Sequence, residues 1–249
     1  MKTKFFFRLP VYIFSKILGS FIFFLFIPSF FFSQSPETKS KKTDRHLFDL
    51  SNYKPEPKDK VVFEFLHCGW LNMPQGVCYD WYSRGSSIFL YFDYPIKKSN
   101  FSFAWGAGMS WHNLSGNMSF SYAIDSLGYV STILEPRQLP YRKNIISAKT
   151  IEIPIDIRFR TRQARSIKIT AGFKFGITVQ NFLKVYDDLG KRKYYDITNY
   201  NPLRYGPTFR IGYEQFFLCG FYSLSQVFNK GFGTPNLIPY TIGLGFTPW

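Results

Sequence analysis

Apolar and polar residues alternate along much of this chain, and the stretch IEIPIDIRFR shows the alternation most clearly. Between Ile151 and Arg160 the odd positions hold isoleucine or phenylalanine, and the even positions are charged except at Pro154. A period of two places the apolar set on one face of a β-strand and the charged set on the other. A soluble sheet would turn these charges to water. A transmembrane strand would turn the isoleucines to lipid and the charges into a barrel lumen.

The same alternation predicts eight strands along the chain. They span residues 61–70, 86–94, 101–112, 147–160, 166–180, 203–214, 216–228 and 237–247. The third is the most regular, since large apolar residues alternate from Phe101 with Ser, Ala and Gly up to His112. Small residues on one face suit a narrow lumen that side chains fill. The parity of the seventh strand stays ambiguous.

The connections between these strands alternate between long and short. Short turns at one end and long loops at the other are typical of an up-and-down outer-membrane barrel. A sandwich with Greek-key connections has no reason to alternate in this way. The sequence therefore predicts an all-β fold, an eight-stranded antiparallel transmembrane up-and-down β-barrel. An even strand number in the outer membrane leaves both termini on the periplasmic side.

The residues before the first strand predict export. Residues 1–33 combine basic residues with a long apolar run and read as a cleaved secretory signal peptide. Phe31 departs from the usual small residue before the cut, so an uncleaved inner-membrane anchor is the alternative. Residues 34–60 are polar and rich in Pro and Lys, which predicts a flexible periplasmic tether. Residues 61–249 form the predicted barrel domain.

Composition supports a membrane surface as the environment of the chain. Aromatic residues make up 21% of the 249 residues, an excess that suits a lipid-facing wall with aromatic belts. The formal net charge is +15. An exported protein rarely meets nucleic acid, so we expect anionic lipid head groups or lipopolysaccharide phosphates as counter-charges. We also expect contact with the barrel-assembly machinery during insertion.

Strand parity places ten charged side chains on the lumen face. They are Glu64, Asp93, Glu152, Asp156, Arg158, Arg160, Lys168, Lys174, Arg204 and Arg210. Unpaired buried charge is costly, so we expect a structural network of ion pairs that fills the lumen. If residues 161–165 form the turn, Glu152 faces Lys174 across the hairpin. A conduction path is disfavoured because eight strands leave room only for side chains.

The sequence offers little for catalysis or metal binding. Ser110 and His112 share a predicted face, but they lie about 7 Å apart along a strand, without an acidic partner at that level. We therefore expect no catalytic residues, no cofactor and no metal. The cysteines are Cys68, Cys78 and Cys219, an odd number without metal-ligand spacing. Free thiols and a disulfide between Cys68 and Cys78 are both open.

The long connection of residues 181–201 carries a basic run. Lys191, Arg192 and Lys193 lie there among tyrosines and acidic residues. A solvated loop is one interpretation. Contact with lipopolysaccharide phosphates or with a partner protein is the other.

Several segments, taken in order, resemble the PorT-like outer-membrane β-barrels of Bacteroidota. They are Trp70 with Pro74-Gln75-Gly76, SRGSSIFLYFDYPIKKSNFSFAWGAGMS, IEIPIDIRFRT, NPLRYGPTFRIGYEQFFLCGFYSLSQVF, and a last strand that ends in GLGF. The resemblance covers nearly all of the predicted mature region. It implies a barrel without catalytic residues. It also implies either an accessory role in type IX protein secretion and the gliding linked to it, or a structural or ligand-binding role unrelated to secretion. A hydrolase or acyltransferase at the outer rim is the remaining alternative.

Overall fold

The computed structural model describes residues 60–97, 99–161, 167–188, 190–234 and 236–248. The predicted signal peptide lies outside these residues, as does the predicted tether except for Lys60. Across the described ranges, no helix is both long and apolar enough to cross a membrane.

The described residues form eleven β-strands. They are β1 Val61–Leu71, β2 Arg84–Pro95, β3 Phe101–Ser115, β4 Met118–Ile124, β5 Val130–Pro136, β6 Lys143–Arg160, β7 Ile167–Asp187, β8 Gly190–Tyr195, β9 Leu203–Tyr213, β10 Phe216–Tyr222 and β11 Ile238–Phe246. Eight of them correspond to the eight predicted strands. β4, β5 and β8 lie in segments that the sequence predicted as loops.

Eight strands close into a ring in which every neighbouring pair is antiparallel. The order is β1, β2, β3, β6, β7, β9, β10 and β11. β11 pairs back onto β1, with Phe63 opposite Phe246. Sequential strands are neighbours throughout, apart from the hairpin β4–β5 and the edge strand β8, which stand outside the ring. The predicted eight-stranded up-and-down barrel is therefore confirmed.

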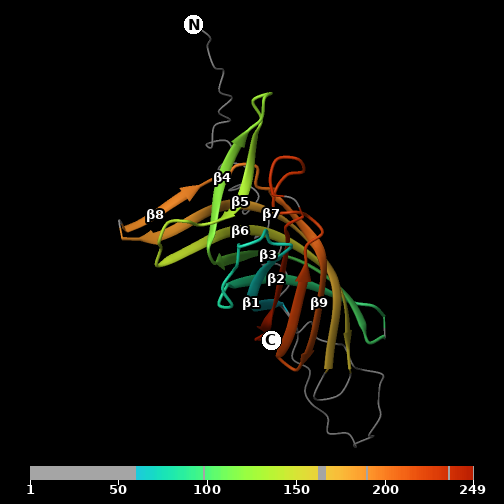
Figure 1. The fold of residues 1–249 in the computed structure, drawn as a ribbon. Helices are drawn as coiled ribbons and strands as arrows, with labels where there is room; N and C mark the ends of the chain where they lie inside the picture. The colour runs from blue at the N-terminus through green and yellow to red at the C-terminus, as the bar shows by residue number, and fades with distance from the viewer. Residues whose placement is uncertain (1–59, 98, 162–166, 189, 235, 249) are drawn as a thin grey trace, which may run out of the picture. The chain divides into compact units, whose positions relative to one another are not determined.

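The two ends of the barrel differ. The turn end holds the short β2–β3, β6–β7 and β9–β10 connections, together with the start of β1 and the end of β11. The loop end holds the long connections, and both β4–β5 and the β7–β8 hairpin extend there beyond the ring (Figure 1). Short and long connections therefore alternate along the chain, as predicted, because successive connections lie at opposite ends of the barrel.

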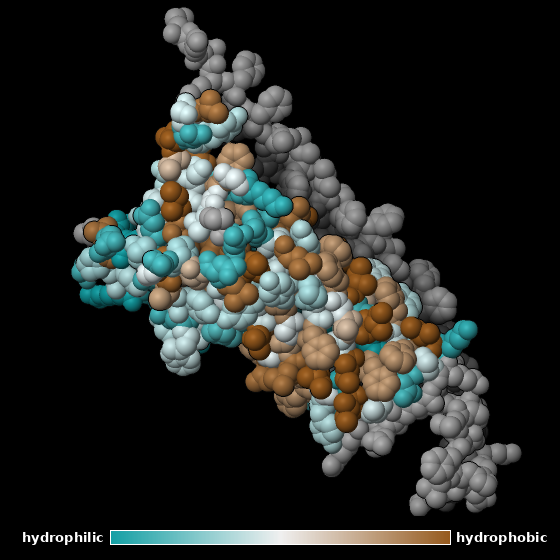
Figure 2. Space-filling view, turned by 45° about the vertical axis from the view of Figure 1, so that its right-hand side comes forward, coloured by the Kyte–Doolittle hydropathy of each residue, from teal (hydrophilic) through white to brown (hydrophobic). Residues whose placement is uncertain are grey.

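The outer wall of the ring is apolar. On β6, Ile151, Ile153, Ile155 and Ile157 are 39–58% exposed, while Glu152 and Asp156 between them are buried. Equivalent outward residues on the other ring strands include Phe65, Leu90, Trp105, Phe175, Phe209, Leu218 and Leu244. Figure 2 shows apolar side chains gathered over the lower part of the visible face and polar ones toward its upper left. An apolar surface of this extent is typical of a wall that faces hydrocarbon.

A β-bulge at Val179 corrects the predicted end of the fifth strand. Lys149 of β6 pairs with Gln180, but Thr150 pairs with Thr178, so Val179 has no partner on β6. The extra residue reverses the parity of β7. Beyond it, the odd residues Leu183 and Val185 point into the core, whereas even residues such as Lys174 do so before it. A strict period of two therefore ended the predicted strand at residue 180, although β7 continues to Asp187.

The loop end has a hydrophobic core of its own, distinct from the barrel lumen. Its buried residues are Trp70, Val77, Leu114, Met118, Leu134, Ile146, Leu183, Val185, Ile197, Val227, Phe228 and Leu237. Buried Asn144 ties the base of β4 to β6, because its Nδ2 donates to the carbonyls of Gly116 and Met118. Thr132 of β5 pairs with the β10–β11 loop through hydrogen bonds to Phe232 and Thr234. We call the β4–β5 hairpin, the loops around it and the hydrophobic core that they share the cap.

Candidate functional site

The middle of the lumen is organised around Arg210 of β9. Its Nε donates to Oε1 of Glu64 at 2.9 Å, and its Nη1 donates to Oδ2 of Asp156 at 2.8 Å. Its Nη2 donates to the hydroxyl of Tyr91 at 2.7 Å. One guanidinium thereby joins β9 to β1, β6 and β2 across the lumen. All four side chains are buried.

Lys174 of β7 forms a second centre toward the loop end. Its Nζ lies 3.2 Å from Oε2 of Glu64 and 3.9 Å from Oε2 of Glu152. Ser110 of β3 donates to the same Glu152 oxygen at 2.6 Å. The ammonium also lies 4.5 Å from the centre of the Phe89 ring, within reach of a cation–π interaction.

Arg158 of β6 forms a third centre toward the turn end. Its guanidinium lies 3.6 Å from Asp93 and 3.7 Å from Asp156. Its Cζ sits 4.2 Å from the centre of the Tyr91 ring. Since Asp156 also binds Arg210, the three centres are one connected set. We call Glu64, Asp93, Glu152, Asp156, Arg158, Lys174 and Arg210 the central network.

Glycines on the lumen face make room for this network. A Cβ built on Gly108 would lie 2.3 Å from the Phe89 ring, and one on Gly245 would lie 2.2 Å from the Phe217 ring. The aromatic rings therefore lie directly over bare backbone. The strands therefore enclose a narrow lumen that side chains fill, as the sequence predicted.

The other three predicted lumen residues lie away from the centre. Arg160 and Lys168 are half-buried and oppose each other across the β6–β7 hairpin at the turn end. Arg204 lies at the loop end. The predicted register of this hairpin is wrong by two residues, because Glu152 lies opposite Gly176 and Lys174 opposite Pro154. A shift of two preserves parity, so Glu152 and Lys174 still point inward and approach each other.

Sequence reasoning missed three contributors to the network. Tyr91, Phe89 and Ser110 supply a hydroxyl donor, an aromatic face and a second hydroxyl donor. Their inward parity was visible in the predicted second and third strands. Only charged residues, however, mark a lumen ion pair in the sequence. An uncharged donor beside a buried carboxylate carries no signal of its own in a sequence.

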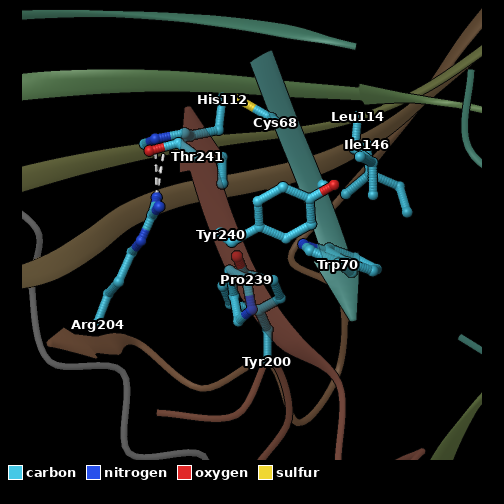
Figure 3. A pocket seen from close by; sticks show the side chains of 12 residues that line it. Cys68, Trp70, His112, Leu114, Ile146, Tyr200, Arg204, Pro239, Tyr240 and Thr241 are labelled. Carbon is cyan, nitrogen blue, oxygen red and sulfur yellow. Dashed lines mark hydrogen bonds between the residues drawn. The ribbon is translucent and has the colours of Figure 1, made fainter. Parts of the chain in front are cut away.

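A cavity lies between the central network and the cap. Its lining residues are Cys68, Gly69, Trp70, His112, Leu114, Ile146, Ala148, Tyr200, Arg204, Pro239, Tyr240 and Thr241. It is small, with a volume of about 40 Å³, and opens partly to solvent. Nη1 of Arg204 lies 2.9 Å from each ring nitrogen of His112 (Figure 3). We call it the loop-end cavity.

Ser110 and His112, the two residues considered for catalysis, bind different partners in the structure. Ser110 is hydrogen bonded to Glu152, whereas His112 contacts Arg204. The three cysteines are free thiols, with Cys68 and Cys219 buried and Cys78 exposed. Among the described residues, no group of three or more His, Cys, Asp or Glu side chains is placed to hold a metal ion.

The basic run lies in β8, which pairs with the far end of β7. The sequence predicted a loop at this position. The run consists of Lys191, Arg192 and Lys193. All three are exposed. Arg192 forms an ion pair with Asp187, and Lys193 lies 5.4 Å from the centre of the Phe182 ring. A hydrogen bond with Lys184 lowers the pKa of Tyr186 on the same hairpin. We call residues 182–195 the basic hairpin.

Comparison with known proteins agrees with this architecture. A family model described as an outer membrane protein beta-barrel domain matches residues 51–229. The matched segment includes the ring strands from β1 to β10 and the whole central network. No curated protein and no solved structure matches the chain.

Proposed function

The chain belongs to the family of outer membrane protein beta-barrel domains, and from this premise we propose that it is a non-enzymatic accessory of type IX protein secretion. It acts by holding partner proteins at its surface. Its loop end faces the cell exterior, and both termini of the barrel domain lie on the periplasmic side.

One observation carries the proposal: the lumen is filled, while the loop end is built out into a folded cap. Seven buried charged side chains of the central network occupy the lumen. Such a barrel has no passage for a protein or a large solute. The elaborated part of the molecule is the cap, and in loop-bearing folds the elaborated loops are where function concentrates.

The tip of the β4–β5 hairpin is the candidate docking element of the cap. Tyr122, Ile124, Leu127 and Tyr129 are 52–78% exposed around a tight turn that Asp125 closes with Tyr129. Large apolar side chains on a projecting hairpin are typical of a protein contact surface. Partner proteins of the secretion machinery are the occupants that we propose.

The resemblance to PorT-like barrels supports the same role. Two of the segments that carry the resemblance form ring strands. SRGSSIFLYFDYPIKKSNFSFAWGAGMS supplies β2 and most of β3, and NPLRYGPTFRIGYEQFFLCGFYSLSQVF supplies β9 and β10. Each segment builds a pair of neighbouring ring strands, and the two pairs lie on opposite sides of the ring.

Deleting the gene and comparing secreted proteins tests the proposal. We expect cargo of the type IX pathway to accumulate inside the cell and the wild-type gene to restore secretion. A variant with Ile124→Asp and Leu127→Asp should insert normally and fail to restore it. Ser121→Ala on the same hairpin is the matched control and should restore it. Unchanged secretion in the deletion strain would exclude the accessory role.

The basic hairpin favours a second candidate, a barrel that holds lipopolysaccharide without taking part in secretion. Lys184, Lys191, Arg192 and Lys193 bring four cations to one exposed hairpin at the loop end. Phosphate groups are suitable counter-charges there. Changing Lys191, Arg192 and Lys193 to Gln should then reduce the lipopolysaccharide retained on purification, with secretion unaffected in the deletion strain.

A further inference from the structure

We propose that the open edge of β8 binds an extended acidic peptide of a partner protein, which adds to the sheet as a further antiparallel strand. This surface lies on the basic hairpin and is separate from the β4–β5 tip. The inference therefore goes beyond the docking role of the cap, and it does not depend on the secretion role. It rests on the free backbone of β8 and on the cations beside that backbone.

β8 is an edge strand at the loop end. The far part of β7 continues beyond the ring and pairs with β6 on one side and with β8 on the other (Figure 1). β8 pairs with β7 alone, and no backbone hydrogen bond from another segment of the described chain reaches its far side. Every residue of β8 is exposed. An exposed strand edge is a template for pairing with another chain.

Alternate residues of β8 direct their backbone groups to this open edge. In an antiparallel pair, residues that exchange hydrogen bonds alternate with residues whose N–H and C=O groups point away from each other. The Tyr186 carbonyl accepts a hydrogen bond from the Arg142 N–H, so it points away from its β8 partner, Lys191. By the same alternation, the N–H and C=O groups of Lys191, Lys193 and Tyr195 face the open edge.

The lysines beside this edge have no carboxylate partner. Lys184 of β7 lies directly opposite Lys193, and like charges in such a pair repel each other. Lys191 lies two residues along β8 on the same face. Within the described residues none of the three forms an ion pair, and each ammonium lies 5.0–6.0 Å from the centre of a Tyr or Phe ring. A carboxylate beside them would relieve the repulsion.

The backbone and the charges together select an acidic strand. Lysine on a strand edge discourages pairing with other strands, whereas an opposite charge across the pair is favourable. An added strand places every second side chain directly opposite Lys191 and Lys193. The sequence that fits therefore carries Asp or Glu at alternate positions. A lipopolysaccharide phosphate would use the cations alone and would leave the backbone edge unpaired.

Fluorescence anisotropy of a labelled peptide with the full chain in neutral detergent micelles tests the inference. The peptide alternates Glu with Thr, carries an uncharged dye and is as long as β8, and empty micelles serve as a blank. We expect saturable binding. N-methylation of the Glu residues removes the N–H groups that would pair with β8 and should weaken binding at least about tenfold. N-methylation of the Thr residues, whose N–H groups would point away from β8, is the matched control and should leave binding unchanged.

Charge variants of the protein complete the test. Lys191→Gln combined with Lys193→Gln should weaken binding about 2- to 30-fold. Lys191→Glu combined with Lys193→Glu should transfer binding to a peptide with Lys in place of Glu. Lys230→Gln, in the exposed β10–β11 loop, is the control and should leave binding unchanged.

Three results would overturn the inference. Equal binding of the two N-methylated peptides would mean that the hairpin is only an anion-binding patch, of the kind that lipopolysaccharide phosphates would use. Wild-type affinity after both lysines are changed to Gln would show that the cations of β8 are not part of the site. Absence of binding to the wild type would exclude an acidic strand as the occupant.

Discussion

Arg210 and Glu64 are 146 residues apart in the chain, and their side chains meet at 2.9 Å in the middle of the lumen. The pair crosses the barrel from β9 to β1, so it bridges strands that share no backbone hydrogen bonds. Asp156 and Tyr91 complete the shell of Arg210 from two further strands. The ring is thus held by its backbone ladder around the circumference and by ion pairs through its centre.

Removing Arg210 should be strongly destabilising. Arg210→Ala leaves Glu64 and Asp156 buried with fewer counter-charges, and we expect a loss of about 3–5 kcal/mol in the free energy of unfolding. Denaturant unfolding in lipid vesicles, followed by tryptophan fluorescence, measures it. Arg142→Ala, at an exposed ion pair with Asp188, is the control and should change stability little. Similar losses at both positions would show that burial in the lumen does not make the Arg210 ion pairs stronger than exposed ones.

The distances around Lys174 predict which of its two carboxylate partners, Glu64 or Glu152, has the larger coupling energy with it. Lys174 lies 3.2 Å from Glu64 and 3.9 Å from Glu152, and Glu152 also accepts a hydrogen bond from Ser110. Double-mutant cycles to Ala should therefore give the larger coupling for Glu64 with Lys174. Both couplings should fall in the range of about 0.5–3 kcal/mol. Strictly additive losses of stability in either cycle would show that the two side chains of that pair do not interact. A larger coupling for Glu152 with Lys174 than for Glu64 with Lys174 would contradict the observed register.

Ile155 should report the depth of the membrane. A strand crosses the bilayer in about 9–11 residues, so a crossing that begins at Arg160 has its centre near Ile155. Ile155→Arg should therefore lower the free energy of unfolding by about 2–4 kcal/mol. Ile124→Arg on the β4–β5 hairpin, where the side chain is 72% exposed, should stay within about 0.5 kcal/mol of the wild type. Unfolding in vesicles compares the two, and a tolerated Ile155→Arg would argue against hydrocarbon at that position.

Two glycines on neighbouring strands should respond in opposite ways to a methyl group. Gly245 of β11 faces inward, and a Cβ there would lie 2.2 Å from the Phe217 ring and 2.6 Å from the Phe63 carbonyl oxygen. We expect Gly245→Ala to cost about 1–3 kcal/mol through overpacking. Gly220 of β10 has nothing within 4 Å of such a Cβ, so Gly220→Ala should be neutral or stabilising. Equal effects in the same unfolding assay would contradict a filled lumen.

Strand parity made much of this structure readable from the sequence. On β6 it separated lipid-facing Ile155 from lumen-facing Asp156, and the same rule found every charged member of the central network. Parity says which face a side chain occupies but not the stagger of one strand against the next. For this reason Glu152 was matched with Lys174 two residues out of register, and the meeting of Arg210 with Glu64 was not foreseen.

The cap was beyond the reach of the same rule. Val179 inserts one residue into β7 and reverses its parity, so the pattern that predicts the strand stops where the strand continues. β4 and β5 are short and project beyond the ring, and part of the core around them comes from loops. Met118 and Leu134, for example, are buried beside Phe228 of the β10–β11 loop. Contacts of this kind depend on where distant loops fold, which local alternation does not encode.

The seam between β1 and β11 constrains the order of folding. Phe63 can meet Phe246 only after the whole intervening chain has been made, so the last strand to be synthesised closes the ring. Until then β1 and β10, its two neighbours, present free edges with unpaired backbone groups, which invite pairing with other chains. Hydrocarbon cannot satisfy those groups either, so an incomplete ring is unsuited to the bilayer. Closure and insertion must therefore be nearly concerted, and we expect a chain that stalls before β11 to be degraded rather than retained as a partial barrel.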